Sequence, residues 1–137
     1  IQCLKNELIK LEKNDILMSC SGTIGRVTIN TLDKKFALVR SVAVIRPNID
    51  LILPLYLMKY LQTDYLQTFM KNKANAAGQP NLFQNQIKQL PVHIPPLTLQ
   101  NKFANIIEKI EEQKALYEKE LKLLEDNFNS LLQRSFS

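Results

Sequence analysis

Apolar residues recur at alternating spacings of four and three along the last third of the chain, Leu99 to Ser137. Nine successive positions carry eight apolar side chains and one lysine: Phe103, Ile107, Ile110, Lys114, Tyr117, Leu121, Leu124, Phe128 and Leu131. This is the a/d pattern of a heptad repeat, here called the seam, and neither glycine nor proline interrupts it. A helix of roughly 34 residues is roughly 50 Å long. It is too long to bury its whole seam on a small domain, so we expect part of the seam to pack on another long helix.

The preceding region shows shorter apolar runs with strand character. Ile16–Met18 predicts a buried strand, residues 24–29 predict the next, interrupted by Gly25, and residues 36–46 predict a third that ends at Pro47. Two glycines three residues apart, Gly22 and Gly25, indicate a tight turn between the first two strands. Residues 4–13 predict a short amphipathic helix or turn.

Helical spacing returns after these strands. Pro54 is predicted as the first residue of a helix that ends near residues 71–73. Its apolar face would comprise Leu55, Met58, Leu61, Tyr65, Leu66 and Phe69. A polar surface loop at residues 75–81, one helical turn within 82–90 and a short strand at 92–94 should follow. Thr98 is predicted to be the N-cap of the long helix.

These elements predict an α+β fold, with a small mixed β domain and packed helices followed by a long C-terminal coiled-coil helix. We place the domain at residues 1–97 and the helix at 98–137. Hydrophobic residues make up 45% and charged residues 23% of the 137-residue chain, which is ordinary for a soluble protein. The chain begins with Ile1, and no signal-peptide pattern follows, so we expect it to begin inside a longer protein. Cys3 and Cys20 lack metal-ligand spacing and are interpreted as reduced, structural residues of a cytoplasmic protein.

Charge is unevenly divided between the two regions. The net charge of +5 splits into +6 for residues 1–98 and −1 for residues 99–137. A basic domain beside a nearly neutral helix suggests that the domain binds a polyanion and the helix binds protein. The alternative is that the positive charge serves only solubility.

The sequence shows no catalytic constellation. The segment Ser21–Arg26 lacks the Gly-Lys-Ser/Thr ending of a phosphate-binding loop. His93 is the only histidine and lies in an apolar stretch, where a structural or surface role is expected. Asp15 precedes a strand and is interpreted as a turn residue. No His, Cys, Asp and Glu cluster has metal-ligand spacing, so we expect neither a catalytic nor a metal site.

Basic and amide side chains are the more informative polar positions. Such side chains contact phosphates and base edges, although each taken singly also fits a solvated surface residue. Arg46 belongs to the same basic group near the strands. The candidate DNA contacts are Arg26, Lys34, Lys35, Arg40, Gln79 and Asn81.

Four segments, in order, resemble the target recognition domains of type I restriction–modification specificity subunits. They are Asp15–Val27 (DILMSCSGTIGRV), Ser41–Asn48 (SVAVIRPN), Gly78–Leu82 (GQPNL) and Ile87–Leu97 (IKQLPVHIPPL) with Gln100. Asn14 stands where the family often has glycine, and Leu99 stands where it has glutamate. The usual opening of such a domain is missing upstream of Ile1, so the resemblance implies a recognition domain without its N-terminal part.

The resemblance implies a non-catalytic subunit that reads double-stranded DNA. Family members carry two recognition domains, each reading half of a split site, and their long helices pair antiparallel. Methyltransferase subunits dock on this frame and a motor–nuclease (restriction) subunit joins them. S-adenosylmethionine, ATP and Mg²⁺ are bound by those partners, so no cofactor is expected here. This chain would be the C-terminal half of a subunit or a half-subunit that forms a homodimer through the helix.

Two other functions remain open from the sequence. One is a coiled-coil adaptor or scaffold whose basic domain does not bind DNA. The other is the recognition domain of a single-chain restriction–methyltransferase, which would require an Asn/Asp-Pro-Pro-Tyr/Phe motif elsewhere in the protein. Salt-sensitive binding to duplex DNA separates the first of these from the DNA-recognition hypothesis.

Overall fold

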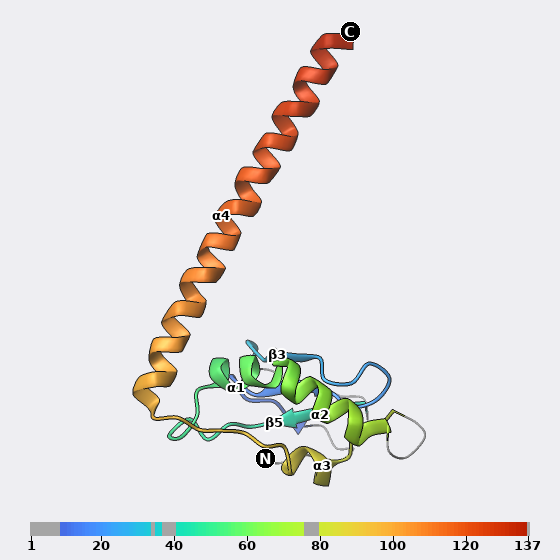
Figure 1. Ribbon diagram of the computed structural model, residues 1–137, viewed down its shortest axis with the longest axis vertical. Coiled ribbons are helices and arrows are strands. Elements are labelled where there is room, and N and C mark those ends of the chain that lie inside the picture. Colours follow the sequence, from blue (N-terminus) through green and yellow to red (C-terminus); the bar gives the residue numbers. More distant parts are fainter. Residues whose placement is uncertain (1–8, 34, 37–40, 76–79, 137) are drawn as a thin grey trace. The chain divides into compact units, whose positions relative to one another are not determined.

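The α+β fold class is confirmed by the computed structural model, which describes residues 9–33, 35–36, 41–75 and 80–136 (Figure 1). The chain forms two units, Ile1–Asn101 and Lys102–Ser137. The strands are β1 (Ile9–Lys10), β2 (Ile16–Ser19), β3 (Val27–Ile29), β4 (Lys35–Phe36) and β5 (Val42–Ile45). The helices are α1 (Pro54–Leu61), α2 (Asp64–Asn75), α3 (Gln84–Lys88) and α4 (Leu97–Phe136).

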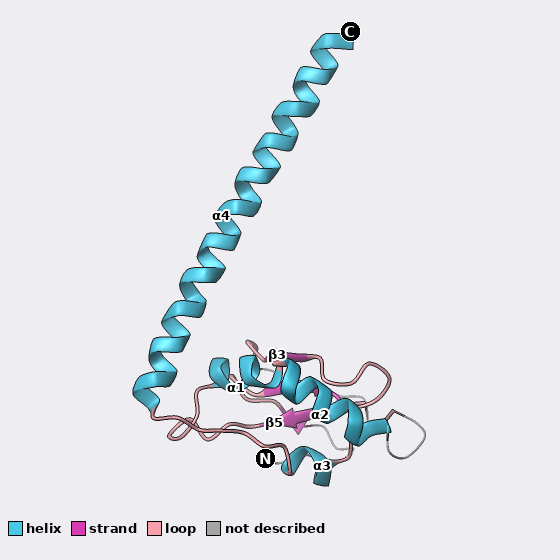
Figure 2. Ribbon diagram, in the orientation of Figure 1, coloured by secondary structure: helices cyan, strands magenta, loops and turns pink. Residues whose placement is uncertain are grey.

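The central sheet of the first unit is antiparallel, with the strand order β3–β2–β5 (Figure 2). Ile16 in β2 is opposite Ile29 in β3 and Ile45 in β5, which fixes the register. The first two predicted strands are therefore confirmed, although Ile24 lies in the turn before β3. The third, predicted over residues 36–46, is confirmed only at Val42–Ile45, because Phe36 belongs to β4 in the other strand pair. A second antiparallel pair joins β1 to β4.

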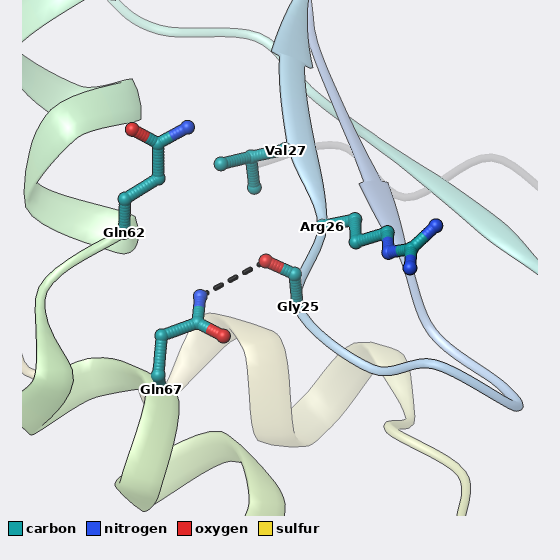
Figure 3. Close-up of a pocket in the computed structure, with 5 residues that line it drawn as sticks. All are labelled: Gly25, Arg26, Val27, Gln62 and Gln67. Atoms are coloured by element: carbon teal, nitrogen blue, oxygen red, sulfur yellow. Dashed lines mark hydrogen bonds between the residues drawn. The ribbon is translucent and has the colours of Figure 1, made fainter.

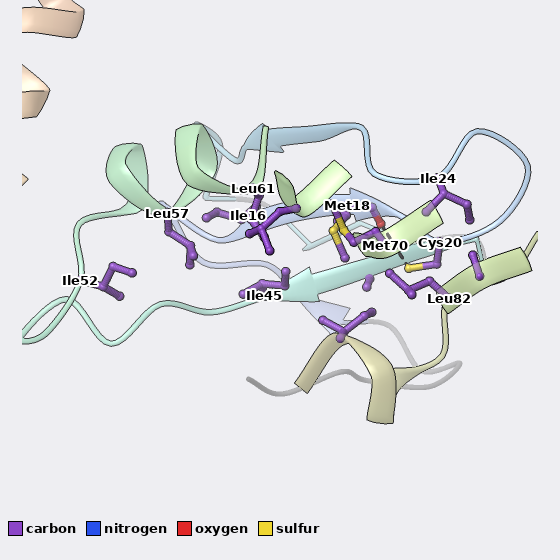
Figure 4. Packing of buried hydrophobic residues seen from close by; sticks show 14 residues of the cluster. Ile16, Met18, Cys20, Ile24, Ile45, Ile52, Leu57, Leu61, Met70 and Leu82 are labelled. Atoms are coloured by element: carbon purple, nitrogen blue, oxygen red, sulfur yellow. Dashed lines mark hydrogen bonds between the residues drawn. The ribbon is translucent and has the colours of Figure 1, made fainter. Parts of the chain in front are cut away.

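The sheet buries apolar side chains on both faces, in the alternation that a strand imposes. Ile16 and Met18 point into the main core, while the intervening Leu17 packs with Leu11 and Val44 on the opposite face. The main core joins β2 and β5 to side chains from α1, α2 and α3 (Figure 4). The helices therefore cover one face of the sheet, and Leu11 lies on the other.

The predicted single helix from Pro54 to residues 71–73 is wrong in one respect, because it is two helices. Pro54 begins α1 as expected, but α1 ends at Leu61. The Thr63 hydroxyl donates to the carbonyl oxygen of Tyr60 and accepts from the backbone N–H of Leu66, and so caps the start of α2. The break changes the buried face. Of the predicted face, Leu61 and Leu66 are buried as expected, whereas Tyr65 is 61% exposed. The other buried residues of the two helices are Leu57, Met70 and Ala74.

Three other expectations fail at element ends. Ile9 and Lys10 form β1 rather than the end of a helix or turn. Residues 92–94 contain no strand, since the backbone there forms no ladder. Helix α4 begins at Leu97, so Thr98 is inside it, and the Pro96 carbonyl accepts from the N–H groups of Leu99 and Gln100. The single helical turn predicted within residues 82–90 is confirmed as α3.

An ion pair between Arg46 and the buried carboxylate of Asp15 ties the turn before β2 to the end of β5. Asp15 is 1% exposed, and its two carboxylate oxygens accept from Nε and Nη2 of Arg46 at 2.9 and 2.8 Å. This hydrogen-bonded pair raises the pKa of Arg46 above its ordinary value, so the guanidinium stays charged. Asn14 beside it has φ +74°, a conformation that asparagine tolerates better than most residues. This explains how Asn14 can replace the glycine of the resembling family.

The first turn of α4 is fixed to the first unit by the fully buried side chain of Gln100. Its Nε2 donates to the carbonyl oxygens of Leu51 and Pro95 at 2.9 and 2.8 Å. Its Oε1 accepts from the backbone N–H of Leu53 at 2.7 Å. One amide thus satisfies three backbone groups in the segments that lead into α1 and α4.

Helix α4 continues through the second unit as 40 residues, about 60 Å at 1.5 Å per residue. The seam is largely uncovered: Tyr117, Leu121, Leu124, Phe128 and Leu131 are each more than half exposed. Among the described residues, no helix is long and apolar enough to cross a membrane. The exposed part of the seam fits a helix that pairs with another helix.

Candidate nucleic-acid interface

The turn between β2 and β3, residues 19–26, carries one of the predicted contacts and is held closed by Ser19. The Ser19 backbone N–H donates to the Arg26 carbonyl, and the Ser19 hydroxyl oxygen accepts from the Arg26 N–H, both at 2.9 Å. The same hydroxyl donates to the carbonyl oxygen of Thr23. These bonds fix the backbone of Arg26, whose side chain is exposed.

Gln67 in α2 supports the turn from the other side. Its Nε2 donates to the carbonyl oxygens of Gly25 and Leu61 at 2.9 and 2.8 Å (Figure 3). Gly25 has φ +87°, and a Cβ there would lie 2.9 Å from Oε1 of Gln67. The backbone conformation therefore favours glycine at this position, and a larger residue would also displace the Gln67 amide.

An open pocket of about 480 Å³ lies beside this turn and is lined by Gly25, Arg26, Val27, Gln62 and Gln67. The Arg26 side chain points away from both glutamines (Figure 3). The lining offers amide and guanidinium groups, which donate hydrogen bonds, but none of these five residues has a carboxylate, imidazole or thiol. The pocket can therefore bind polar groups, while it lacks the side chains of acid–base or nucleophilic catalysis.

Of the predicted contacts, the structure describes the side chains of Arg26 and Asn81, and both lie at this turn. Asn81 is half-buried and forms an antiparallel bridge with Ser21. The adjoining Leu82 N–H donates to the Cys20 carbonyl at 2.7 Å. Asn81 and Leu82 are thus joined to the turn that carries Arg26, although Arg26 and Asn81 are 55 positions apart in the sequence. The loop predicted at residues 75–81 lies largely outside the described residues, and Asn75 ends α2.

The structure does not describe the side chains of the other four predicted contacts. The backbone of Lys35 lies in β4, but its side chain is not among the described parts of the chain. Lys34, Arg40 and Gln79 lie wholly outside the described residues. Arg46, from the same basic group, is held in the ion pair with Asp15 and has a structural role. Asp15 is accordingly a structural acid, as the sequence suggested.

Sequence reasoning missed two glutamines with structural roles. Gln67 holds the turn at residues 19–26, and Gln100 holds the segments that lead into α1 and α4. Gln67 lies next to the buried Leu66, and no pattern distinguishes it from a solvated helical glutamine. Gln100 belongs to the resembling segment, yet its complete burial could not be inferred from an amphipathic spacing. His93, by contrast, is exposed as expected, and its backbone carbonyl accepts from the Tyr56 hydroxyl at 2.9 Å.

Replacing Gly25 by alanine should destabilise the protein more than the same change at Gly22. Both glycines have positive φ, so the strained backbone of an alanine at either site should lower the free energy of unfolding by about 1–2 kcal/mol. At Gly22 the added Cβ meets nothing within 4 Å, whereas at Gly25 it must displace Gln67. Urea denaturation of the two variants measures the difference, and equal losses would contradict the role given to Gln67.

Comparison with known proteins agrees with this architecture. Residues 4–126 match the model of the type I restriction modification DNA specificity domain. The chain is also 29% identical over 101 residues to the type I restriction enzyme EcoBI specificity subunit of Escherichia coli. That alignment covers 74% of this chain and 21% of the relative, so the chain spans about a fifth of the relative's length. Since the family match extends over most of the chain, this protein belongs to the family of type I restriction–modification DNA specificity domains.

Proposed function

We propose that this chain recognises a specific sequence in double-stranded DNA as the specificity subunit, or half of it, of a type I restriction–modification complex. The observation that carries the proposal is the family match over residues 4–126. The +6 charge of residues 1–98 supports it, because DNA affinity rests largely on contacts to phosphates. The chain itself is proposed to be non-catalytic.

The turn at residues 19–26 is the proposed centre of the DNA contact. Arg26 is exposed there on a backbone fixed by Ser19 and Gln67, so little conformational freedom is lost when it binds. Asn81 at the same turn offers an amide for a base edge or phosphate. Lys34, Lys35, Arg40 and Gln79 complete the proposed set of contacts.

Helix α4 is the proposed spacer and protein interface. At about 60 Å it would span nearly two turns of DNA at about 34 Å each, which suits a ruler between two half-sites. Its seam, including Phe103, Ile107 and Ile110, is proposed to pair with the helix of a second recognition unit in the same protein or another copy. Methyltransferase and restriction subunits would assemble on this frame in the cytoplasm and supply S-adenosylmethionine, ATP and Mg²⁺.

Binding of duplex DNA by the purified chain at several salt concentrations tests the function. A linear fall of log K with log salt is expected for a protein that displaces counterions from phosphates. Capture of the tagged chain from its native cells should in addition recover an adenine methyltransferase subunit. Absence of DNA binding together with capture of unrelated proteins would favour a coiled-coil adaptor.

Replacing Lys34 and Lys35 by alanine is expected to flatten this salt dependence by up to about two phosphate contacts. Each lysine that neutralises a phosphate adds about 0.9 to the slope. The matched control replaces Lys109 and Lys119, which lie on α4 outside the seam and remove the same charge. An unchanged slope in the Lys34/Lys35 variant would exclude both lysines from the interface.

A further inference from the structure

The uncovered seam of α4 is bordered by acidic residues, and this restricts the helix that can cover it. We propose that the seam pairs with a helix carrying lysine or arginine at its flanking positions, which selects between the two partners named above and disfavours a second copy of this chain. The proposal rests on the pairing role proposed above and names the chemistry of the partner. It is carried by the distribution of charges around α4.

The heptad set by the seam assigns Ile107, Lys114, Leu121 and Phe128 to position a, and it defines flanking positions e and g on each side. Ten flanking positions lie between residues 104 and 134. Four of them are exposed glutamates, and Arg134 is the one cation among the ten. The glutamates are Glu111, Glu118, Glu120 and Glu125.

The cations of α4 lie mostly on the opposite face. Lys102 and Lys109 are at position c, Lys119 is at f and Lys122 is at b, all pointing away from a partner. Within the seam only Lys114 is charged, and its Nζ lies 3.9 Å from a carboxylate oxygen of Glu111. The strip that a partner would cover, the seam with its flanks, therefore has a net charge of −2 between residues 103 and 134.

A second copy would bring these glutamates together in either orientation. In an antiparallel pair e faces e and g faces g. In the register that places Tyr117 opposite Leu121, Glu118 meets the same residue of the second copy and Glu111 meets its Glu125. In a parallel pair g faces e, which places Glu120 opposite Glu125. Repulsion between like charges at e and g disfavours such a pair, and Lys114 offsets only part of this repulsion between glutamates. A helix with basic flanks gains attraction at the same positions.

The test is a charge exchange between two full-length chains. One is the natural chain, and the other carries Glu111→Lys, Glu118→Lys, Glu120→Lys and Glu125→Lys. With a fluorophore on one of them, sedimentation equilibrium should show the mixed pair at least about tenfold tighter than pairing of the natural chain with itself. At about 1 M salt the Debye length is only about 3 Å, so this preference should largely disappear.

The control variant reverses the remaining acids of α4, Glu108, Glu112 and Asp126, which lie at outward b and f positions. This variant should show no preference for the natural chain. A natural homodimer as tight as the mixed pair would overturn the inference and leave helix pairing intact. If no combination pairs at any salt concentration, both the inference and the proposed role of the seam are wrong.

Discussion

Replacing Leu121 and Leu124 by aspartate is expected to abolish pairing of α4 with any partner helix. These leucines are 57% and 66% exposed, occupy the a and d positions and lie near the middle of the seam. Burying each would contribute about 1.5–3 kcal/mol, and a carboxylate in its place adds a desolvation cost. Together these changes lower the association constant by several orders of magnitude. Sedimentation equilibrium of the chain alone, and of its mixture with the charge-reversed chain, measures the loss.

Leu116 and Leu123 provide a matched control for this experiment. They are 60% and 56% exposed on the same helix but occupy outward c positions. Aspartate at these two sites makes the same chemical change and should leave pairing intact. Survival of the pair in the Leu121/Leu124 variant would show that the seam is not the interface.

Replacing Gln100 by alanine is expected to destabilise the first unit strongly. The side chain is fully buried, and its loss leaves two carbonyl oxygens and one N–H without their partner. Such groups cost about 1–3 kcal/mol each where water cannot replace the bond. Since part of this backbone is near solvent, we expect a total of about 3 kcal/mol, measured by urea or thermal unfolding.

Two variants make the Gln100 result specific. Gln113→Ala removes the same side chain from an exposed position of the same helix and should change stability by less than about 0.5 kcal/mol. Gln100→Glu keeps an acceptor for the Leu53 N–H but loses both donors, so a substantial loss should remain. A Gln100→Ala variant as stable as Gln113→Ala would contradict the anchoring role.

The sequence predicted correctly those helices and strands that are specified by residues close together in the chain. The apolar run at β2, proline at the start of α1 and the heptads of α4 each specify an element within a few residues. The break between α1 and α2 was missed because continuous apolar spacing hid the Thr63 cap. The strand expected at residues 92–94 failed because β propensity needs a neighbouring strand to pair with.

The candidate interface was predictable in residue type but not in geometry. The turn could be located from Gly22 and Gly25, and basic and amide residues could be selected by their chemistry. Its conformation, however, depends on Gln67, 42 residues further along the chain, and its neighbourhood depends on the bridge from Ser21 to Asn81. Likewise, Arg46 could not be separated from the exposed cations until its bond to Asp15 was seen.

The glutamine side chains that hold the backbone have a consequence for the proposed binding of DNA. Gln67, Gln86 and Gln100 hold backbone carbonyls through neutral amides, whose bonds are neither screened by ions nor titrated near neutral pH. Contacts to phosphates, by contrast, weaken steeply as salt rises. If the chain binds DNA as proposed, an increase in ionic strength should dissociate the complex and leave the domain folded, so that binding can be reversed repeatedly without refolding.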